Sequence, residues 1–149
     1  MNKLKLDFEI LPSGAWNFNL RTQTSKKAWD VVRKDAYQKS NYRCSICGSK
    51  PKILHAHEKW HFDKETHTQK LVDVIAVCPA CHLVIHIGRT QLIGKEDIAI
   101  RHFKKVNNVD FSAYTKALSR ANTENISLSN IDDWQLDLSY LKKFINPKG

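Results

Sequence analysis

The sequence predicts an α+β protein in which a small strand-rich core carries helices at both ends. Apolar residues alternate in some segments and recur every three or four positions in others, which predicts strands and helices respectively. All four cysteines occur in two C-x-x-C pairs, at 44–47 and 78–81, which predicts a shared structural site. The chain of 149 residues is about one domain long, so we expect one compact unit.

The N-terminal part is predicted to form two strands followed by a helix. Apolar side chains alternate over residues 4–10 and 16–20, on either side of a Pro-Ser-Gly turn, which is typical of a strand pair. Ser25 can cap a helix over residues 26–39. The helical stripe of this segment is Trp29, Val32, Ala36 and Lys39.

The chain between and after the cysteine pairs is predicted to form two strands and a short helix. Residues 52–62 suit a strand, 63–70 an irregular loop, and 71–77 a second, buried strand. A helix over 80–87 should follow at once, with Gly88 as its C-terminal stop.

The C-terminal part is predicted to be mainly helical. Helices are expected over residues 95–106 and 111–121, a polar connection over 123–130, and a strand that turns helical over 134–144. The first half of that last segment could add a strand to the N-terminal pair. The expected core positions of the two helices are Ile98, Phe103, Val106, Tyr114, Ala117, Leu118 and Ala121.

The charge balance favours a polyanionic partner. Lys and Arg number 24 against 15 Asp and Glu, a net charge of +9, and nucleic acid is the commonest polyanion. No apolar run approaches the roughly 20 residues that a membrane span needs, and the N-terminus lacks the apolar run of a secretory signal. We therefore expect a cytoplasmic protein, in a reducing compartment, with no membrane partner.

In a reducing compartment, two C-x-x-C pairs about 30 residues apart indicate a structural zinc site rather than disulfides. A thioredoxin-like redox role would not need two such pairs in one small domain. The expected zinc ligands are Cys44, Cys47, Cys78 and Cys81.

The histidines that follow the second cysteine pair indicate a second metal ion. His82 and His86 lie four residues apart, on one face of the predicted helix. They cannot join a zinc ion that four thiolates already surround, because structural zinc takes four ligands. A third ligand should come from the segment His55-Ala-His57-Glu58. Imidazoles suit zinc or nickel, and added carboxylate and water would admit magnesium or manganese.

This arrangement resembles the HNH endonucleases of the ββα-metal class. The resemblance covers residues 42–89, about a third of the chain, and its most specific part is "CPACHLVIH". It implies a ββα-metal core at 41–89, stapled by the four-cysteine zinc site. Residues 1–40 would pack on that core, and residues 90–149 would form a helical extension of it. It also implies metal-dependent hydrolysis of phosphodiester bonds in DNA.

The resemblance assigns roles residue by residue. The four cysteines match the structural zinc ligands, and His57, His82 and His86 match the ligands of a catalytic divalent metal. Glu58 stands where the family has its general base, normally histidine, and Asp73 stands where it has its central asparagine. In a second assignment, His57 is the base, and Glu58 joins the two helix histidines as a metal ligand.

Two departures from the family pattern keep other functions open. An ionised aspartate accepts hydrogen bonds but cannot donate them, and glutamate is a weaker base than histidine at neutral pH. The alternatives are a zinc-stapled nucleic-acid-binding protein without catalysis, and a zinc module that binds another protein.

Basic residues near the predicted metal site indicate how the substrate would be held. Arg89, Lys59 and Lys64 could hold the phosphates of a nucleic acid. We expect DNA, with RNA as the alternative. A double-strand cut by one such site usually implies two copies, which makes a homodimer one expectation.

Overall fold

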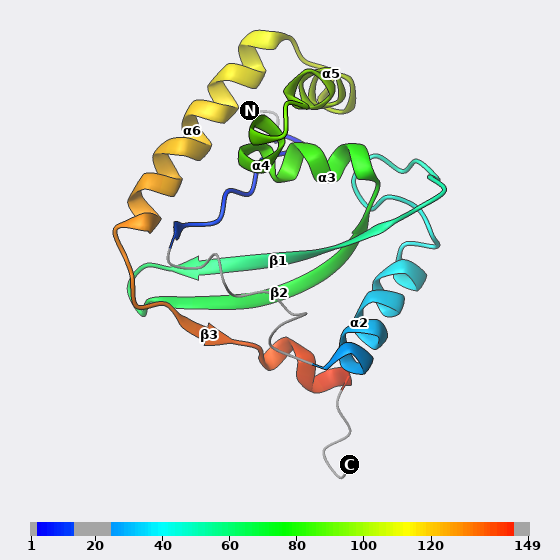
Figure 1. The fold of residues 1–149 in the computed structure, drawn as a ribbon, viewed down its shortest axis with the longest axis vertical. Coiled ribbons are helices and arrows are strands. Elements are labelled where there is room, and N and C mark those ends of the chain that lie inside the picture. Colours follow the sequence, from blue (N-terminus) through cyan, green and yellow to red (C-terminus); the bar gives the residue numbers. More distant parts are fainter. Residues whose placement is uncertain (1–2, 14–24, 145–149) are drawn as a thin grey trace.

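The computed structural model describes residues 3–13 and 25–144, and it is a mixed α+β fold as predicted (Figure 1). In chain order its elements are α2 (Lys26–Lys39), β1 (His55–Asp63), β2 (Thr68–Val77), α3 (Pro79–Ile85), α4 (Ile87–Leu92), α5 (Glu96–Asn107), α6 (Phe111–Ser129), β3 (Gln135–Asp137) and the 3₁₀ helix η2 (Ser139–Phe144). None of the helices within these two ranges is long and apolar enough to cross a membrane.

A three-stranded sheet of order β1-β2-β3 forms the centre of the fold. β1 and β2 are antiparallel, with His57 opposite Ile75 and Glu58 opposite Val74. Successive side chains of a strand point to opposite faces, so these two pairs lie on different faces of the sheet. The predicted loop over 63–70 is shorter than expected, because β2 already begins at Thr68.

The two faces of the sheet have separate hydrophobic clusters. The Ile75 side packs against a cluster from α3, α5, α6 and the N-terminal segment, which includes Ile85 and Phe103. Val74 belongs to a second cluster with Trp29 of α2 and Leu141 of η2. Figure 1 shows α2 and η2 on the other side of the hairpin from α3–α5. His57 therefore points towards α3, whereas Glu58 points towards α2.

Helix α2 matches its prediction. The Ser25 hydroxyl accepts a hydrogen bond from the Ala28 N–H at 3.1 Å, as an N-cap should. Trp29, Val32 and Ala36 are buried against the sheet. After the helix ends, Asn41 and Tyr42 adopt positive φ angles, which turn the chain towards the first cysteine pair.

The prediction of one helix over 80–87 with a stop at Gly88 is wrong. The structure has two short helices, α3 and α4, which meet at His86, and Gly88 lies inside the second one. The His86 backbone leaves the helical region, with φ −96° and ψ 54°. The Thr90 hydroxyl donates to the carbonyl oxygens of Leu83 and His86, which supplies partners for backbone acceptors at the break.

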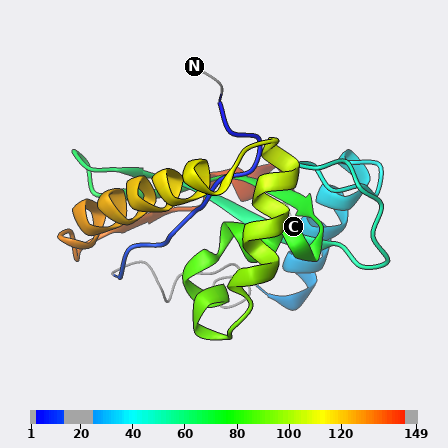
Figure 2. The same ribbon diagram turned by 90° about the horizontal axis from the view of Figure 1, so that it is seen from above.

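The predicted N-terminal strand pair is also wrong in the part that the structure describes. Residues 4–10 form no strand, and residues 16–20 lie outside the described residues. The backbone of Leu6 instead pairs with a side chain, because Asn107 accepts from its N–H at 2.9 Å and donates to its carbonyl at 2.8 Å. Phe8 stacks on Phe103, with ring centroids 5.3 Å apart. Seen from above, this segment passes close to α6 and the α3–α5 helices (Figure 2).

The C-terminal elements differ from their prediction in three ways. The polar stretch 123–130 largely continues α6, which ends at Ser129, rather than connecting elements. Ile98 is 42% exposed rather than core, because the face of α5 that packs inward carries Ala99 and Phe103. β3 does form, but it pairs in parallel with β2 and not with the N-terminal segment.

Candidate metal centres

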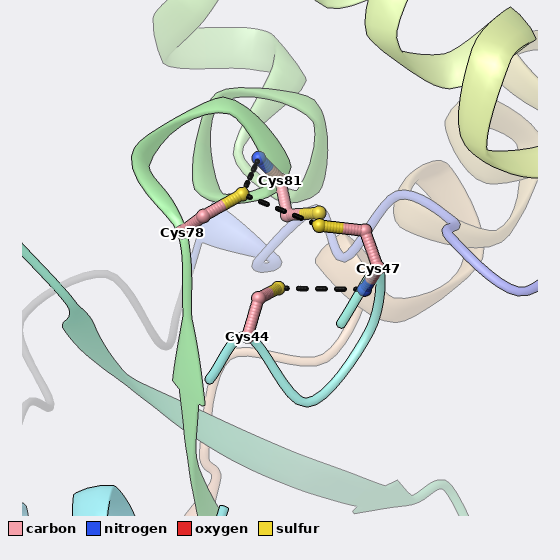
Figure 3. A group of neighbouring side chains, drawn as sticks. All are labelled: Cys44, Cys47, Cys78 and Cys81. Carbon is pink, nitrogen blue, oxygen red and sulfur yellow. Dashed lines mark hydrogen bonds between the residues drawn. The ribbon is translucent and has the colours of Figure 1, made fainter. Parts of the chain in front are cut away.

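The four cysteine sulfurs come together as predicted (Figure 3). Cys44 and Cys47 lie in the turn after α2, and Cys78 and Cys81 lie at the start of α3. All four sulfurs are within 4.8 Å of one another, and the Cys47 and Cys78 sulfurs are 3.8 Å apart. Tetrahedral zinc with bonds of about 2.3 Å separates its sulfurs by about 3.8 Å. The cluster therefore fits a metal ion such as zinc.

Backbone amides point at the sulfurs from both pairs. The Cys47 N–H donates to Cys44 Sγ at 3.5 Å, and the Cys81 N–H donates to Cys78 Sγ at 3.3 Å. Gly48 adopts φ +77°, a left-handed conformation that glycine adopts without strain. N–H groups directed at sulfur stabilise the thiolate that a metal requires.

Contacts among the four cysteines shift the pKa values of their thiols in opposite directions. A hydrogen bond with the Cys81 thiol lowers the pKa of Cys44 to about 4, and the same contact raises the pKa of Cys81. Burial raises the pKa of Cys78. Nearby negative charge makes four thiolates unfavourable together, so a divalent cation is the group that would let all four ionise. His102 adds a further contact, with its Nε2 3.1 Å from Cys81 Sγ.

A second cluster consists of His57, His82 and His86, whose ligand nitrogens also lie within 4.8 Å of one another. His57 comes from β1, His82 from α3, and His86 from the junction of α3 and α4. The ring centroids of His82 and His86 are 4.6 Å apart, and that of His57 is 5.5 and 5.1 Å from theirs. Three imidazoles in this arrangement could hold a metal ion, and they leave a coordination position open.

The surroundings of the cluster keep the helix imidazoles neutral. Burial, followed by the neighbouring imidazoles, lowers the pKa of His82 to about 3. Burial, followed by His57, lowers the pKa of His86 to about 4. Both rings therefore present unprotonated nitrogen at neutral pH, which is the form that binds metals.

Two side chains outside the cluster bind its rings, and sequence analysis did not single out either contact. Nε2 of His57 donates to Oε1 of Glu9 at 2.9 Å, and Oε2 of Glu9 accepts from Lys59 at 3.3 Å. Burial opposes ionisation of Glu9, but His57 and Lys59 outweigh it, so the pKa of Glu9 lies below its usual value. Nδ1 of His55 is hydrogen-bonded to Nδ1 of His82 at 2.9 Å.

A pocket of about 500 Å³ opens beside the histidine cluster. Its lining includes all three rings together with Glu58 and Arg89. Glu58 reaches this pocket from the opposite face of β1, which is the end strand in the order β1-β2-β3. The structure thus gathers the expected metal ligands, the expected base and one expected phosphate contact around a single pocket.

The remaining expected site residues lie elsewhere. Asp73 does not line the pocket, and its carboxylate accepts from Tyr140 at 3.1 Å and from Lys39 at 3.4 Å. Lys64 pairs with Glu124 at 3.2 Å, beside the hairpin turn. Lys59 is held by Glu9, at the side of the cluster.

Comparison of the chain with protein-family models, with curated proteins and with solved structures finds no match. The class of protein that the fold and the two clusters define is therefore an α+β protein with a four-cysteine and a three-histidine group, each able to hold a metal ion.

Proposed function

We propose that this chain is a metal-dependent endonuclease of the HNH ββα-metal type, which hydrolyses phosphodiester bonds in DNA. One observation carries the proposal: His57, His82 and His86 converge beside Glu58 and Arg89 in one pocket. The succession β1, β2 and α3 supports it, because β1 supplies His57, α3 supplies His82, and His86 follows at the C-terminal end of α3, in the order that the resemblance implies.

The proposed reaction needs an activated water, a polarised phosphate and a stabilised leaving oxygen. A divalent ion held by the three histidines would supply positive charge to the phosphate and the leaving oxygen. Arg89 lines the same pocket and would bind a neighbouring phosphate oxygen. The cysteine cluster would serve structure, since four thiolates leave a zinc ion no open position.

The geometry favours Glu58 over His57 as the general base. His57 is 3% exposed, its Nε2 already donates to Glu9, and it belongs to the histidine cluster. Glu58 also lines the pocket and is not part of that cluster. Glu58 would accept the proton from water, while His57 serves as a metal ligand.

The net charge of +9 supports a nucleic-acid substrate, because basic faces attract the phosphate backbone. Contacts to phosphates position a protein without reading sequence. We therefore expect cleavage with weak sequence preference.

The test is to incubate plasmid DNA with the protein and magnesium, manganese, nickel or zinc. Wild-type protein should nick the plasmid only when a divalent ion is added. His82→Ala should abolish nicking by removing a metal ligand. Glu58→Gln should abolish nicking while the histidine cluster still binds its ion. His61→Ala is the matched control, because His61 is an exposed histidine of β1 that does not line the pocket. Nicking by His82→Ala at the wild-type rate would refute the proposal.

A second candidate function is DNA binding without catalysis. Asp73 favours it, because this side chain bonds Lys39 and Tyr140 instead of bracing the pocket. Tight binding that weakens steeply with salt, with no nicking under any of the four metals, would select this function.

A further inference from the structure

The N-terminal segment contributes a carboxylate to the histidine cluster from outside the ββα unit. Oε1 of Glu9 lies 2.9 Å from Nε2 of His57, across 48 positions of sequence. His57 is 3% exposed, so this hydrogen bond is shielded from competing water on the imidazole side. The Glu9 side chain is 32% exposed, so the contact has a buried imidazole end and a half-buried carboxylate end.

The backbone on both sides of Glu9 is held in place. The Glu9 N–H donates to the Ile85 carbonyl of α3 at 2.9 Å. Phe8 stacks on Phe103 and meets Tyr114 edge-on at 5.5 Å. The carboxylate therefore projects from an anchored segment. That segment is bonded to α3, the helix that carries His82.

The hydrogen bond also determines which nitrogen of His57 is available. An ionised carboxylate can only accept, so Nε2 carries the proton, and in the neutral ring that metal binding requires Nδ1 carries the lone pair. A carboxylate on the outer nitrogen of a metal-binding imidazole fixes its tautomer and orientation and raises its basicity.

We propose that Glu9 is the positioning residue of the histidine metal centre, holding the His57 ring so that Nδ1 faces the ion. This inference rests on the metal site of the proposed function, although it does not require that the protein cut DNA. Glu9 acts through His57 and is not itself a ligand, since the metal-binding group that the structure brings together comprises three imidazoles.

The experiment measures metal binding without any nucleic acid. Protein that carries one zinc ion per chain is titrated with cobalt(II), and binding is followed by the visible absorption of the cobalt centre. Wild type, Glu9→Gln and Glu9→Ala are compared, with His86→Ala as the variant that lacks a ligand. Asp7→Asn is the matched control, because Asp7 is an exposed carboxylate of the same segment that contacts Arg120 instead.

Glu9→Ala should weaken cobalt binding about 10- to 100-fold. Glu9→Gln should weaken it less and shift the absorption spectrum, because the amide keeps a hydrogen bond but loses the charge. A loss of packing alone would not move the spectrum. Asp7→Asn should match wild type. Retention of one zinc per chain and an unchanged far-ultraviolet spectrum establish that each variant is folded, and Glu9→Gln decides the matter if Glu9→Ala does not fold.

Two results would overturn the inference. Wild-type affinity and spectrum in both Glu9 variants would remove Glu9 from the site. A wild-type chain that takes up no second ion would overturn this inference together with the metal site. Cobalt uptake that depends on Glu9, in a protein that does not nick DNA, would support the inference and refute only the nuclease.

Discussion

The stability of the folded chain should fall as the pH drops from 7 to 5, because the half-buried imidazoles of His82 and His86 resist protonation. The folded pKa values of His82 and His86 are about 3 and about 4, below the ordinary 6.5. Between those values and 6.5 the unfolded chain binds more protons than the folded chain, so stability rises with pH across this window. The contribution of the two neutral imidazoles to the free energy of unfolding is complete above pH 6.5, and it is lost as the pH falls towards the folded pKa values.

The expected size of this effect follows from the two shifts. For a ring whose pKa falls from 6.5 to about 4, the free energy of unfolding declines by about 2 kcal/mol between pH 7 and pH 5. His82 would contribute a similar amount, reduced by whatever part of its shift comes from His86.

Urea unfolding at a series of pH values, with the histidine cluster free of metal, measures the decline. His86→Gln should lose about 2 kcal/mol less than wild type over the same interval. Protonation of the cysteines is common to both proteins and cancels in the difference. Identical pH slopes for wild type and variant would refute the reasoning.

Three further predictions concern the fold. Both amide atoms of Gln69 are buried without a partner, so Gln69→Leu should raise the free energy of unfolding by about 1–2 kcal/mol in urea titration; a decrease would mean that the amide makes a bond the structure does not record. Cys78→Ser should lower zinc content below one per chain by atomic emission, and retention of a full equivalent would contradict the cysteine site. Asp110 accepts from the Ala113 N–H at 3.0 Å, so Asp110→Ala should cost about 1 kcal/mol by thermal unfolding, and an unchanged midpoint would show that α6 does not need this cap.

The elements that sequence analysis predicted well are those whose signals are local. Ser25 and the spacing of Trp29, Val32 and Ala36 suffice to define α2, because capping and helical periodicity act within a few residues. The two cysteine pairs and the histidines of α3 likewise follow from short-range spacing.

Two features that sequence analysis missed depend on partners far away in the chain. Alternating apolar residues at 4–10 indicate an extended backbone, but only a neighbouring strand makes it a strand, and Asn107 supplies the hydrogen bonds instead. The contact between Glu9 and His57 has no local signal, since an acid between Phe8 and Ile10 looks like an ordinary exposed residue. The failed helix stop at Gly88 has a local cause instead, because the backbone departs from helix at His86 and the Thr90 hydroxyl, four residues later, donates to the His86 carbonyl.

One seven-residue helix serves both clusters, since α3 presents Cys78 at its cap, Cys81 within its first turn and His82 directly afterwards. Oxidation or alkylation of the cysteine sulfurs would therefore disturb the imidazoles as well. Loss of the Cys78 cap would loosen the start of α3, the helix that positions His82. Oxidation of the cysteines would then disturb the pocket without modifying any residue that lines it.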